Sequence, residues 1–262
     1  MSLVNRLIFD IRRSKSPVFR FIKKALRFCF SPVLPPLPRL LLGPLRVAYE
    51  LHFLTVTLCR SLLTICYRNP LFQARCASFG HRVVLEGLPF VSGHLAIHVG
   101  NDVKLGANIT IISGSACDQP NLILKDRCSV GWNTKFTVSQ EVIVEEDVLI
   151  SYDCRISDSD GHRREADLRA AGVPPGPKDV RPVRICRYAL IGNGSHIMKG
   201  VTIGEGATVA ANSLVITNVP PYSLAIGNPA EILFRNYGLP TSARKKRPVE
   251  SQPGQASSPG QG

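Results

Sequence analysis

A six-residue repeat runs through residues 185–219 and restricts the folds open to this chain more than any other feature. An aliphatic residue leads each hexad, and a small or β-branched residue follows four places later. The leading residues are Ile185, Ile191, Ile197, Ile203, Val209 and Val215. A period of six fits strands, whose side chains alternate, and does not fit the 3.6-residue period of a helix. The run therefore predicts short strands separated by regular corners.

The same register appears earlier in three shorter phases, which begin at Val99, Leu124 and Val144. Glycine often takes the second place of the hexad, as at Gly106 and Gly192. A corner at which a Cβ atom would clash explains this preference. Three hexads make one coil of about 18 residues, in which each leading side chain points inward and stacks on its counterpart one coil away. The pattern therefore predicts a parallel β-helix.

The segments 189–233 (ALIGNGSHIMKGVTIGEGATVAANSLVITNVPPYSLAIGNPAEIL) and 147–162 (DVLISYDCRISDSDGH) carry a family resemblance. They resemble the hexapeptide-repeat acyltransferases, nearest to the maltose/galactoside and the capsule or exopolysaccharide O-acetyltransferases. The resemblance covers about residues 90–235. It implies an all-β fold, the left-handed parallel β-helix, here with an α-helical N-terminal region. It also implies a homotrimer with active sites between neighbouring subunits, and acetyl-CoA as co-substrate along the C-terminal coils.

A polar loop, ISDSDGHRREAD at residues 156–167, interrupts the repeat. In the family the coil is interrupted just before the catalytic histidine, and His162 falls on that position. A sugar hydroxyl is a weak nucleophile, and an imidazole can accept its proton during attack on a thioester. The resemblance thus implies that His162 is the general base, with Asp158 and Asp160 as candidate carboxylates that orient it. A solvated Asp-Gly turn is the alternative.

The resemblance also implies which residues contact the two substrates. Asn133 matches an asparagine that contacts the acceptor in the sugar enzymes, with a turn-forming role as the alternative. Arg163 is a candidate for binding a phosphate or an acidic sugar, with a solvated arm as the alternative. The residues predicted to bind CoA are Gly192, Asn193, Ala210, Ala211, Thr217 and Arg235. Leu190, the Thr217-Asn218 pair and Glu231 depart from the family's usual residues, which leaves the contacts to the CoA phosphates open.

The N-terminal segment, residues 1–70, combines apolar and basic residues at helical spacing, and residues 1–46 hold ten Lys or Arg against one Asp. This composition is typical of helices that lie on a membrane surface. The window 47–66 contains Glu50, His52 and Arg60, which disfavours a transmembrane span. A helical cap packed on the domain is the alternative. We expect a cytoplasmic protein, peripheral on the inner face of an anionic membrane.

The predicted organisation is a basic helical region (1–70), a connector (71–93), the β-helix domain (94–239) with its loop (157–182), and a disordered tail (240–262). The net charge of +13 suits anionic partners, but no motif for nucleic-acid binding is present, so we expect none. The eight cysteines include no CxxC pair, and we expect small buried thiols rather than a zinc cage. His94 and His98 lie several coils away from His162, so no metal site is predicted.

These observations predict an acetyl-CoA-dependent O-acetyltransferase that acts on a sugar hydroxyl, small or lipid-linked, in polysaccharide or cell-envelope biosynthesis. Three alternatives stay open. They are an N-acyltransferase acting on an amino sugar, a serine acetyltransferase, and a non-catalytic β-helical assembly module.

Overall fold

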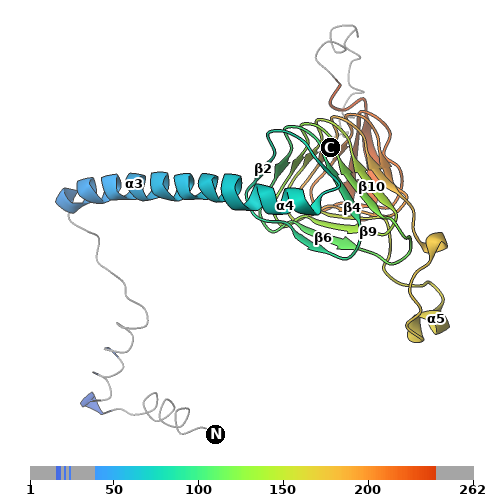
Figure 1. Ribbon diagram of the computed structural model, residues 1–262, viewed down its shortest axis with the longest axis horizontal. Coiled ribbons are helices and arrows are strands. Elements are labelled where there is room, and N and C mark those ends of the chain that lie inside the picture. The colour runs from blue at the N-terminus through green and yellow to red at the C-terminus, as the bar shows by residue number, and fades with distance from the viewer. Residues whose placement is uncertain (1–15, 19–20, 22–23, 25–38, 240–262) are drawn as a thin grey trace, which may run out of the picture. The chain divides into compact units, whose positions relative to one another are not determined.

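The structure is a computed structural model that describes residues 16–18, 21, 24 and 39–239 (Figure 1). Most of the basic segment before residue 39 and the whole of the predicted tail, 240–262, lie outside these residues. The described chain falls into two compact units, Met1–Leu58 and Cys59–Gly262.

A long helix, α3 (Arg39–Leu63), leads into a π-helical turn (Thr64–Arg68) and then into helix α4 (Asn69–Arg75). From Gly43 to Leu63 every side chain of α3 is exposed apart from Val56. The exposed large apolar residues of α3 are Leu45, Val47, Tyr49, Leu51, Phe53, Leu54, Leu58, Leu62 and Leu63. Among the described helices, none combines the length and the hydropathy that crossing a bilayer requires.

The second unit is a stack of three-sided coils, and each side contributes one strand per turn to a sheet. Sheet A contains β1 (Ser78–Phe79), β4 (Ala96–Val99), β7 (Asn121–Leu124), β10 (Glu141–Val144), β13 (Val183–Ile185) and β16 (Thr202–Ile203). Sheet B contains β2 (Val84–Leu85), β5 (Lys104–Leu105), β8 (Ser129–Val130), β11 (Leu149–Ile150), β14 (Leu190–Ile191), β17 (Thr208–Val209), β19 (Ser223–Gly227) and β20 (Ala230–Arg235). Sheet C contains β3 (Phe90–Ser92), β6 (Thr110–Ser113), β9 (Lys135–Val138), β12 (Arg155–Ser157), β15 (His196–Ile197) and β18 (Leu214–Val215).

The leading residues of the hexads form the core, as the repeat predicts. Ile191 pairs with Ile150 and Val209 in the neighbouring coils, and all three side chains are fully buried. Each such column removes several aliphatic side chains from water, at about 1.5–3 kcal/mol for each side chain. The strand pairs are parallel except for the hairpin of β19 and β20.

The glycines at the second hexad place stand where the next coil leaves no room for a side chain. A Cβ atom on Gly192 would lie 2.5 Å from the amide nitrogen of Ala211, and one on Gly131 would lie 2.5 Å from the carbonyl carbon of Ser151. Contacts this close do not occur between real atoms, so the geometry agrees with the steric reason proposed from the sequence.

The coils begin at Ser78, inside the segment 71–93 that the sequence analysis assigns to a connector. Phe79, Leu85 and Val91 are six residues apart and pair with Val99, Leu105 and Ile111 of the next coil. The first coil was missed because it begins with an aromatic residue. Helix α4 covers the open end of this coil, since Phe72 is 1% exposed and its ring packs edge-on against Phe79 at 6.2 Å.

Candidate active site

The polar loop of residues 158–181 leaves the stack after β12 and returns at β13. We use the term C–A corner for the segments that run from a sheet C strand to the next sheet A strand, and B–C corner for those from sheet B to sheet C. The loop is an enlarged C–A corner that carries helix α5 (Ala166–Ala170) and a 3₁₀ turn (Pro177–Asp179) outside the coils (Figure 1). Its base is closed by a bridge between Ser159 and Val180 and by the Arg181 amide, which donates to the Asp158 carbonyl at 2.9 Å.

Asp158 anchors the start of this loop to the preceding coil. Its side chain is fully buried, and its carboxylate accepts hydrogen bonds from the amides of Ser139, Gln140 and Glu141 at 2.6–2.8 Å. Burial raises the pKa of the Asp158 carboxyl, and the three amide hydrogen bonds oppose that shift. These partners give Asp158 a structural role at the corner, and they leave its carboxylate without a contact to His162.

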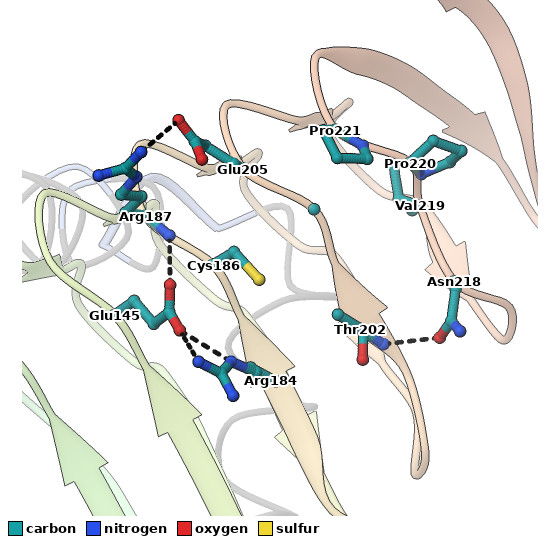
Figure 2. A pocket seen from close by; sticks show the side chains of 11 residues that line it. Glu145, Arg184, Cys186, Arg187, Thr202, Glu205, Asn218, Val219, Pro220 and Pro221 are labelled. Atoms are coloured by element: carbon teal, nitrogen blue, oxygen red, sulfur yellow. Dashed lines mark hydrogen bonds and ion pairs between the residues drawn. The ribbon is translucent and has the colours of Figure 1, made fainter.

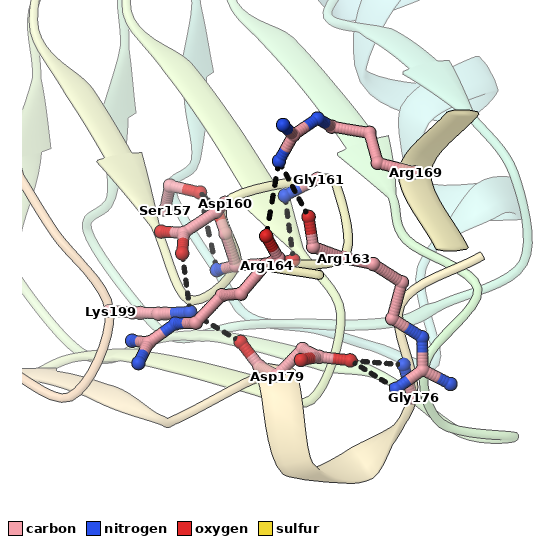
Figure 3. Close-up of polar contacts among 10 residues, drawn as sticks. Ser157, Asp160, Gly161, Arg163, Arg164, Arg169, Gly176, Asp179 and Lys199 are labelled. Atoms are coloured by element: carbon pink, nitrogen blue, oxygen red, sulfur yellow. Dashed lines mark hydrogen bonds and ion pairs between the residues drawn. The ribbon is translucent and has the colours of Figure 1, made fainter. Parts of the chain in front are cut away.

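Lys199 fastens both ends of the loop to the following coil (Figure 3). Its side chain is 6% exposed, and its ammonium group contacts the Asp160 carboxylate at 2.5 Å and donates to the Asp179 carbonyl at 2.7 Å. A buried lysine is stable only when it is paired, so these two contacts fix the segment that holds His162. Sequence reasoning missed Lys199. Its signal is a charged residue at the corner position that the uncharged Thr217 takes in the following coil.

Arg163 has partners inside the loop. Its guanidinium donates to Asp179 Oδ2 at 2.9 Å and to the Pro174 carbonyl at 2.9 Å. Gly176 donates its amide to the same Asp179 oxygen. The side chain predicted to bind a phosphate or an acidic sugar is therefore part of the brace that shapes the loop. Asp160, predicted beside His162, likewise has Lys199 as its partner.

His162 is exposed and makes no hydrogen bond or ion pair with any residue that the structure describes. Its neighbour Gly161 borders a hollow of about 570 Å³ along the C–A corners of the preceding coils. His94, Ser115, Asp118 and Thr137 line this hollow with polar groups. A free imidazole one residue from a hollow that carries polar groups is placed to accept the proton of a hydroxyl bound there.

The residues predicted to bind CoA and the acceptor divide between two corners. Thr217 lies on a C–A corner, on the same edge of sheet C as His162. Asn133, Gly192, Asn193, Ala210 and Ala211 lie on B–C corners, at the opposite edge of sheet C. Arg235 ends β20 and is exposed. Within one chain, the structure therefore does not bring the B–C group to His162.

Asn133 has the turn geometry that the sequence analysis gave as its alternative role. Its φ is +58°, and Asn108, Asn133 and Asp153 join successive B–C corners through side-chain hydrogen bonds of 3.1 and 3.0 Å. Asparagine tolerates this left-handed conformation better than most residues.

A second hollow of about 550 Å³ lies on the outer face of sheet A near the C-terminal coils (Figure 2). Its two arginines are already paired: Arg184 with Glu145, and Arg187 with Glu205 at 3.1 Å. Burial would raise the pKa of the Glu145 carboxyl, but hydrogen bonds from Arg184 and the Arg187 amide outweigh it and hold the pKa below its ordinary value. Asn218, one of the departures from the family pattern, accepts a hydrogen bond from the Thr202 amide at the edge of this hollow.

The described cysteines are all free, and their burial differs from the expectation. Cys128 and Cys154 are buried, as predicted, whereas Cys59 and Cys66 on the N-terminal helices are exposed. No three His, Cys, Asp or Glu side chains converge as a metal site would require, among the residues that the structure describes.

Comparison with known proteins supports the fold and the class. The bacterial transferase hexapeptide (six repeats) model matches residues 182–217. A candidate acetyltransferase of Staphylococcus aureus is 38% identical over 58 residues, which is 22% of this chain and 29% of that protein. A candidate acetyltransferase of Saccharomyces cerevisiae is 29% identical over 118 residues, 45% of this chain and 58% of that protein. The chain thus spans less than two thirds of either relative.

Among solved structures, a variant of the N-acyltransferase AntD from Bacillus cereus, in complex with dTDP-4-amino-4,6-dideoxyglucose and coenzyme A, has a TM-score of 0.51 at 16% identity. The match covers 64% of this chain and 88% of that one, and at this identity it shows the fold alone. The repeat model, the relatives and the coiled architecture confirm the resemblance that the sequence indicates, to the hexapeptide-repeat acyltransferases with their left-handed parallel β-helix.

Proposed function

We propose that this chain is an acetyl-CoA-dependent O-acetyltransferase that acts on a sugar hydroxyl in polysaccharide or cell-envelope biosynthesis. His162 acts as the general base and takes the hydroxyl proton as the oxygen attacks the thioester carbonyl, while CoA leaves as the thiol. The observation that carries the proposal is His162 itself, an exposed imidazole without a partner among the described residues. It stands on a loop braced by Asp158 and Lys199, and its neighbour Gly161 borders a hollow that carries polar groups.

The division of the candidate residues between two corners supports a homotrimer. In a closed ring each copy presents one surface to one neighbour and a different surface to the other. A ring of three can therefore place the B–C corner of one copy, with Asn193 and Ala211, against the C–A corner of the next, with His162. CoA would then lie along the C-terminal coils, where the small side chains of Ala210 and Ala211 allow a close approach to backbone amides.

In this proposal, the N-terminal helices hold the enzyme at the cytoplasmic face of a membrane. Phe53 and Leu62 of α3 are 60% and 61% exposed, and Arg46 and Arg60 lie on the same helix. Apolar and cationic side chains together suit a helix that lies in an anionic interface. A lipid-linked sugar would be within reach of an enzyme held there.

Donor binding is the first test. Calorimetry of purified protein with acetyl-CoA, CoA and a longer acyl-CoA should give a dissociation constant near micromolar for acetyl-CoA, roughly −8 kcal/mol. If a folded protein binds none of these thioesters, the acetyltransferase proposal fails and the assembly module gains support.

Turnover is the second test, with sugar acceptors and mass spectrometry of the product. His162→Ala should lower kcat by roughly 10²–10⁴-fold because the hydroxyl loses its base. His81→Ala is a matched control on an exposed corner away from the loop, and it should keep wild-type kcat. An amide product with amino-sugar acceptors, and no ester, would replace O-acetylation by N-acylation.

Mixing two inactive variants tests the shared site. Ala211→Trp should block the CoA path on the B–C corner, and His162→Ala removes the base on the C–A corner. When the two variants are unfolded and refolded together, about a quarter of the sites should be intact, because each site takes one corner from each of two copies. No recovery of activity would place the whole site within one chain.

A further inference from the structure

Three basic side chains form a column on the outer face of sheet C. Lys135, Arg155 and His196 occupy the same outward position in β9, β12 and β15, and the strand register pairs Arg155 with both of the others. Neighbouring strands are about 4.8 Å apart, so the column spans about 10 Å along the stack. We call these three residues the basic column.

The basic column has no acidic partner. None of its three side chains makes an ion pair or hydrogen bond with a residue in the described part of the chain, whereas Arg184 on the adjoining face of the same coils is paired with Glu145. Like charges on directly neighbouring strands oppose each other and are destabilising. A surface that needed only to be solvated could carry acidic residues beside the basic ones, as the turns between sheets A and B do at Arg127, which contacts Asp147 at 2.7 Å.

A hollow of about 220 Å³ lies at the basic column. All three basic residues line it, together with Thr137, whose hydroxyl has no hydrogen-bond partner among the described residues. Sites for whole small molecules measure about 300–1,000 Å³, so this one has room for one group of a larger ligand. Cations with a free hydroxyl donor are the chemistry that binds phosphoryl oxygens, with Arg as a bidentate donor and Lys as a point charge.

The basic column is next to the proposed active site along the chain. Arg155 begins β12, and the same strand runs directly into the loop that carries His162. A ligand held at the column would therefore have its adjacent group at the C–A corner. Two cations and an imidazole stacked along the coil axis suit a diphosphate better than a single carboxylate, because each phosphoryl group brings its own charge and acceptor oxygens.

We propose that the basic column, Lys135, Arg155 and His196, binds the phosphate or diphosphate group of a substrate. This inference rests on the proposed function, since it names the chemistry that anchors a substrate of that site. Two molecules could supply the group, a sugar acceptor linked through phosphate or CoA itself. The same variants separate these two sources.

The experiment measures binding of inorganic pyrophosphate by calorimetry at low salt. Wild-type protein should bind it, and the double variant Lys135→Gln/Arg155→Gln should bind at least tenfold more weakly. Lys104→Gln is the matched control, because Lys104 holds the equivalent outward position on sheet B, and it should stay within twofold of wild type. Raising the ionic strength should weaken the wild-type affinity, since salt screens exposed charges.

Acetyl-CoA binding by the same double variant identifies the source. An unchanged dissociation constant for acetyl-CoA assigns the group to the acceptor, and a loss that matches the pyrophosphate result assigns it to CoA. The inference is overturned if wild type does not bind pyrophosphate, or if the double variant binds it as well as wild type does. A double variant that loses only its oligomeric state would instead make the column a contact between copies and would also overturn it.

These readouts separate the inference from the function on which it rests. Pyrophosphate binding through the column in a protein that binds no acyl thioester would remove the acetyltransferase proposal and keep the anion site. If the double variant turns over normally and the wild type binds no pyrophosphate, the acetyltransferase proposal stands and the anion site is removed.

Discussion

The coils and helix α3 both carry many large apolar side chains, but only the coils bury them. Ile97, Ile150 and Ile191 are 0% exposed inside the coils, whereas Leu51 and Leu62 of α3 are 59% and 61% exposed. A coil is completed by the coils above and below it, so its interior needs nothing from outside the chain. Nine large apolar side chains of α3 are exposed among the described residues, and exposed apolar surfaces of this kind often mark an interaction site. The difference predicts that α3 meets another surface, and four experiments test that contrast.

Thiol reactivity should differ most between the two regions. Burial raises the pKa of the Cys128 thiol inside the coils to about 12, so only about 10⁻⁴ of it is thiolate at pH 8. Cys59 on α3 is exposed, so the reagent reaches it directly and it should react far faster than Cys128. Timed iodoacetamide labelling at pH 8 with peptide mapping should modify Cys59 on α3 and leave Cys128 intact. Raising the pH toward 12 should increase the Cys128 rate, because its thiolate fraction rises. Protection of Cys59 in purified protein would show that another molecule or copy already covers the helix.

Truncation of an apolar side chain should cost stability only in the coils. Ile191→Ala opens a cavity in a fully buried column and should lower the free energy of unfolding by about 2–5 kcal/mol. Leu54→Ala on α3 removes a side chain that is 55% exposed and should change it by no more than about 0.5 kcal/mol. Urea denaturation followed by circular dichroism measures both. Similar losses in the two variants would mean that α3 is packed in solution.

The coils could be predicted from sequence because every hexad must meet the same steric requirement, so the same residue types recur. Even the first coil obeys it, since Phe79 and Gly80 occupy the places that Val99 and Gly100 take one coil later. A Cβ atom on Gly80 would lie 2.3 Å from the Gly100 carbonyl oxygen. Of its three leading residues, only Phe79 departs from the aliphatic pattern of the later coils. The break in the repeat marked the loop, and the family resemblance supplied His162 as the candidate base within it.

The surroundings of His162 could not be predicted, because they depend on how distant segments meet. Lys199 reaches Asp160 only after the loop and one further turn of the coil have formed. Asp158 has the same carboxylate as Asp160, yet it accepts hydrogen bonds from the backbone amides of Ser139 and its neighbours. The basic column was hidden for a related reason. The long loop between Arg155 and His196 breaks the spacing, so their alignment emerges only from the strand register.

Lys199, the buried partner of the exposed Asp160, should behave as part of the coil interior. Lys199→Met leaves the Asp160 carboxylate and the Asp179 carbonyl without their donor, and it should lower the free energy of unfolding by about 1–3 kcal/mol. Hydrogen exchange in residues 158–181 should become faster, because the loop loses its attachment to the next coil. Arg127→Met is the control, since it removes an exposed ion pair with Asp147 and should change neither quantity. Unchanged exchange in the loop would assign its order to Asp158 and Arg163 alone.

The smallest expected effect concerns the surface that α3 meets. If that surface is an anionic membrane, each cation near it adds about 1 kcal/mol, so Arg60→Gln should weaken binding to phosphatidylglycerol vesicles roughly fivefold. Vesicle sedimentation measures the partition, with neutral phosphatidylcholine vesicles for comparison and Arg127→Gln as a variant with the same change of charge on the coils. If both variants lose the same amount of vesicle binding, the attraction depends on net charge alone, and the helix has no specific role in it. If the wild-type protein binds neither kind of vesicle and self-associates through α3, the partner of this helix is a second copy of the chain. The exposed apolar residues of α3 would then be an assembly surface.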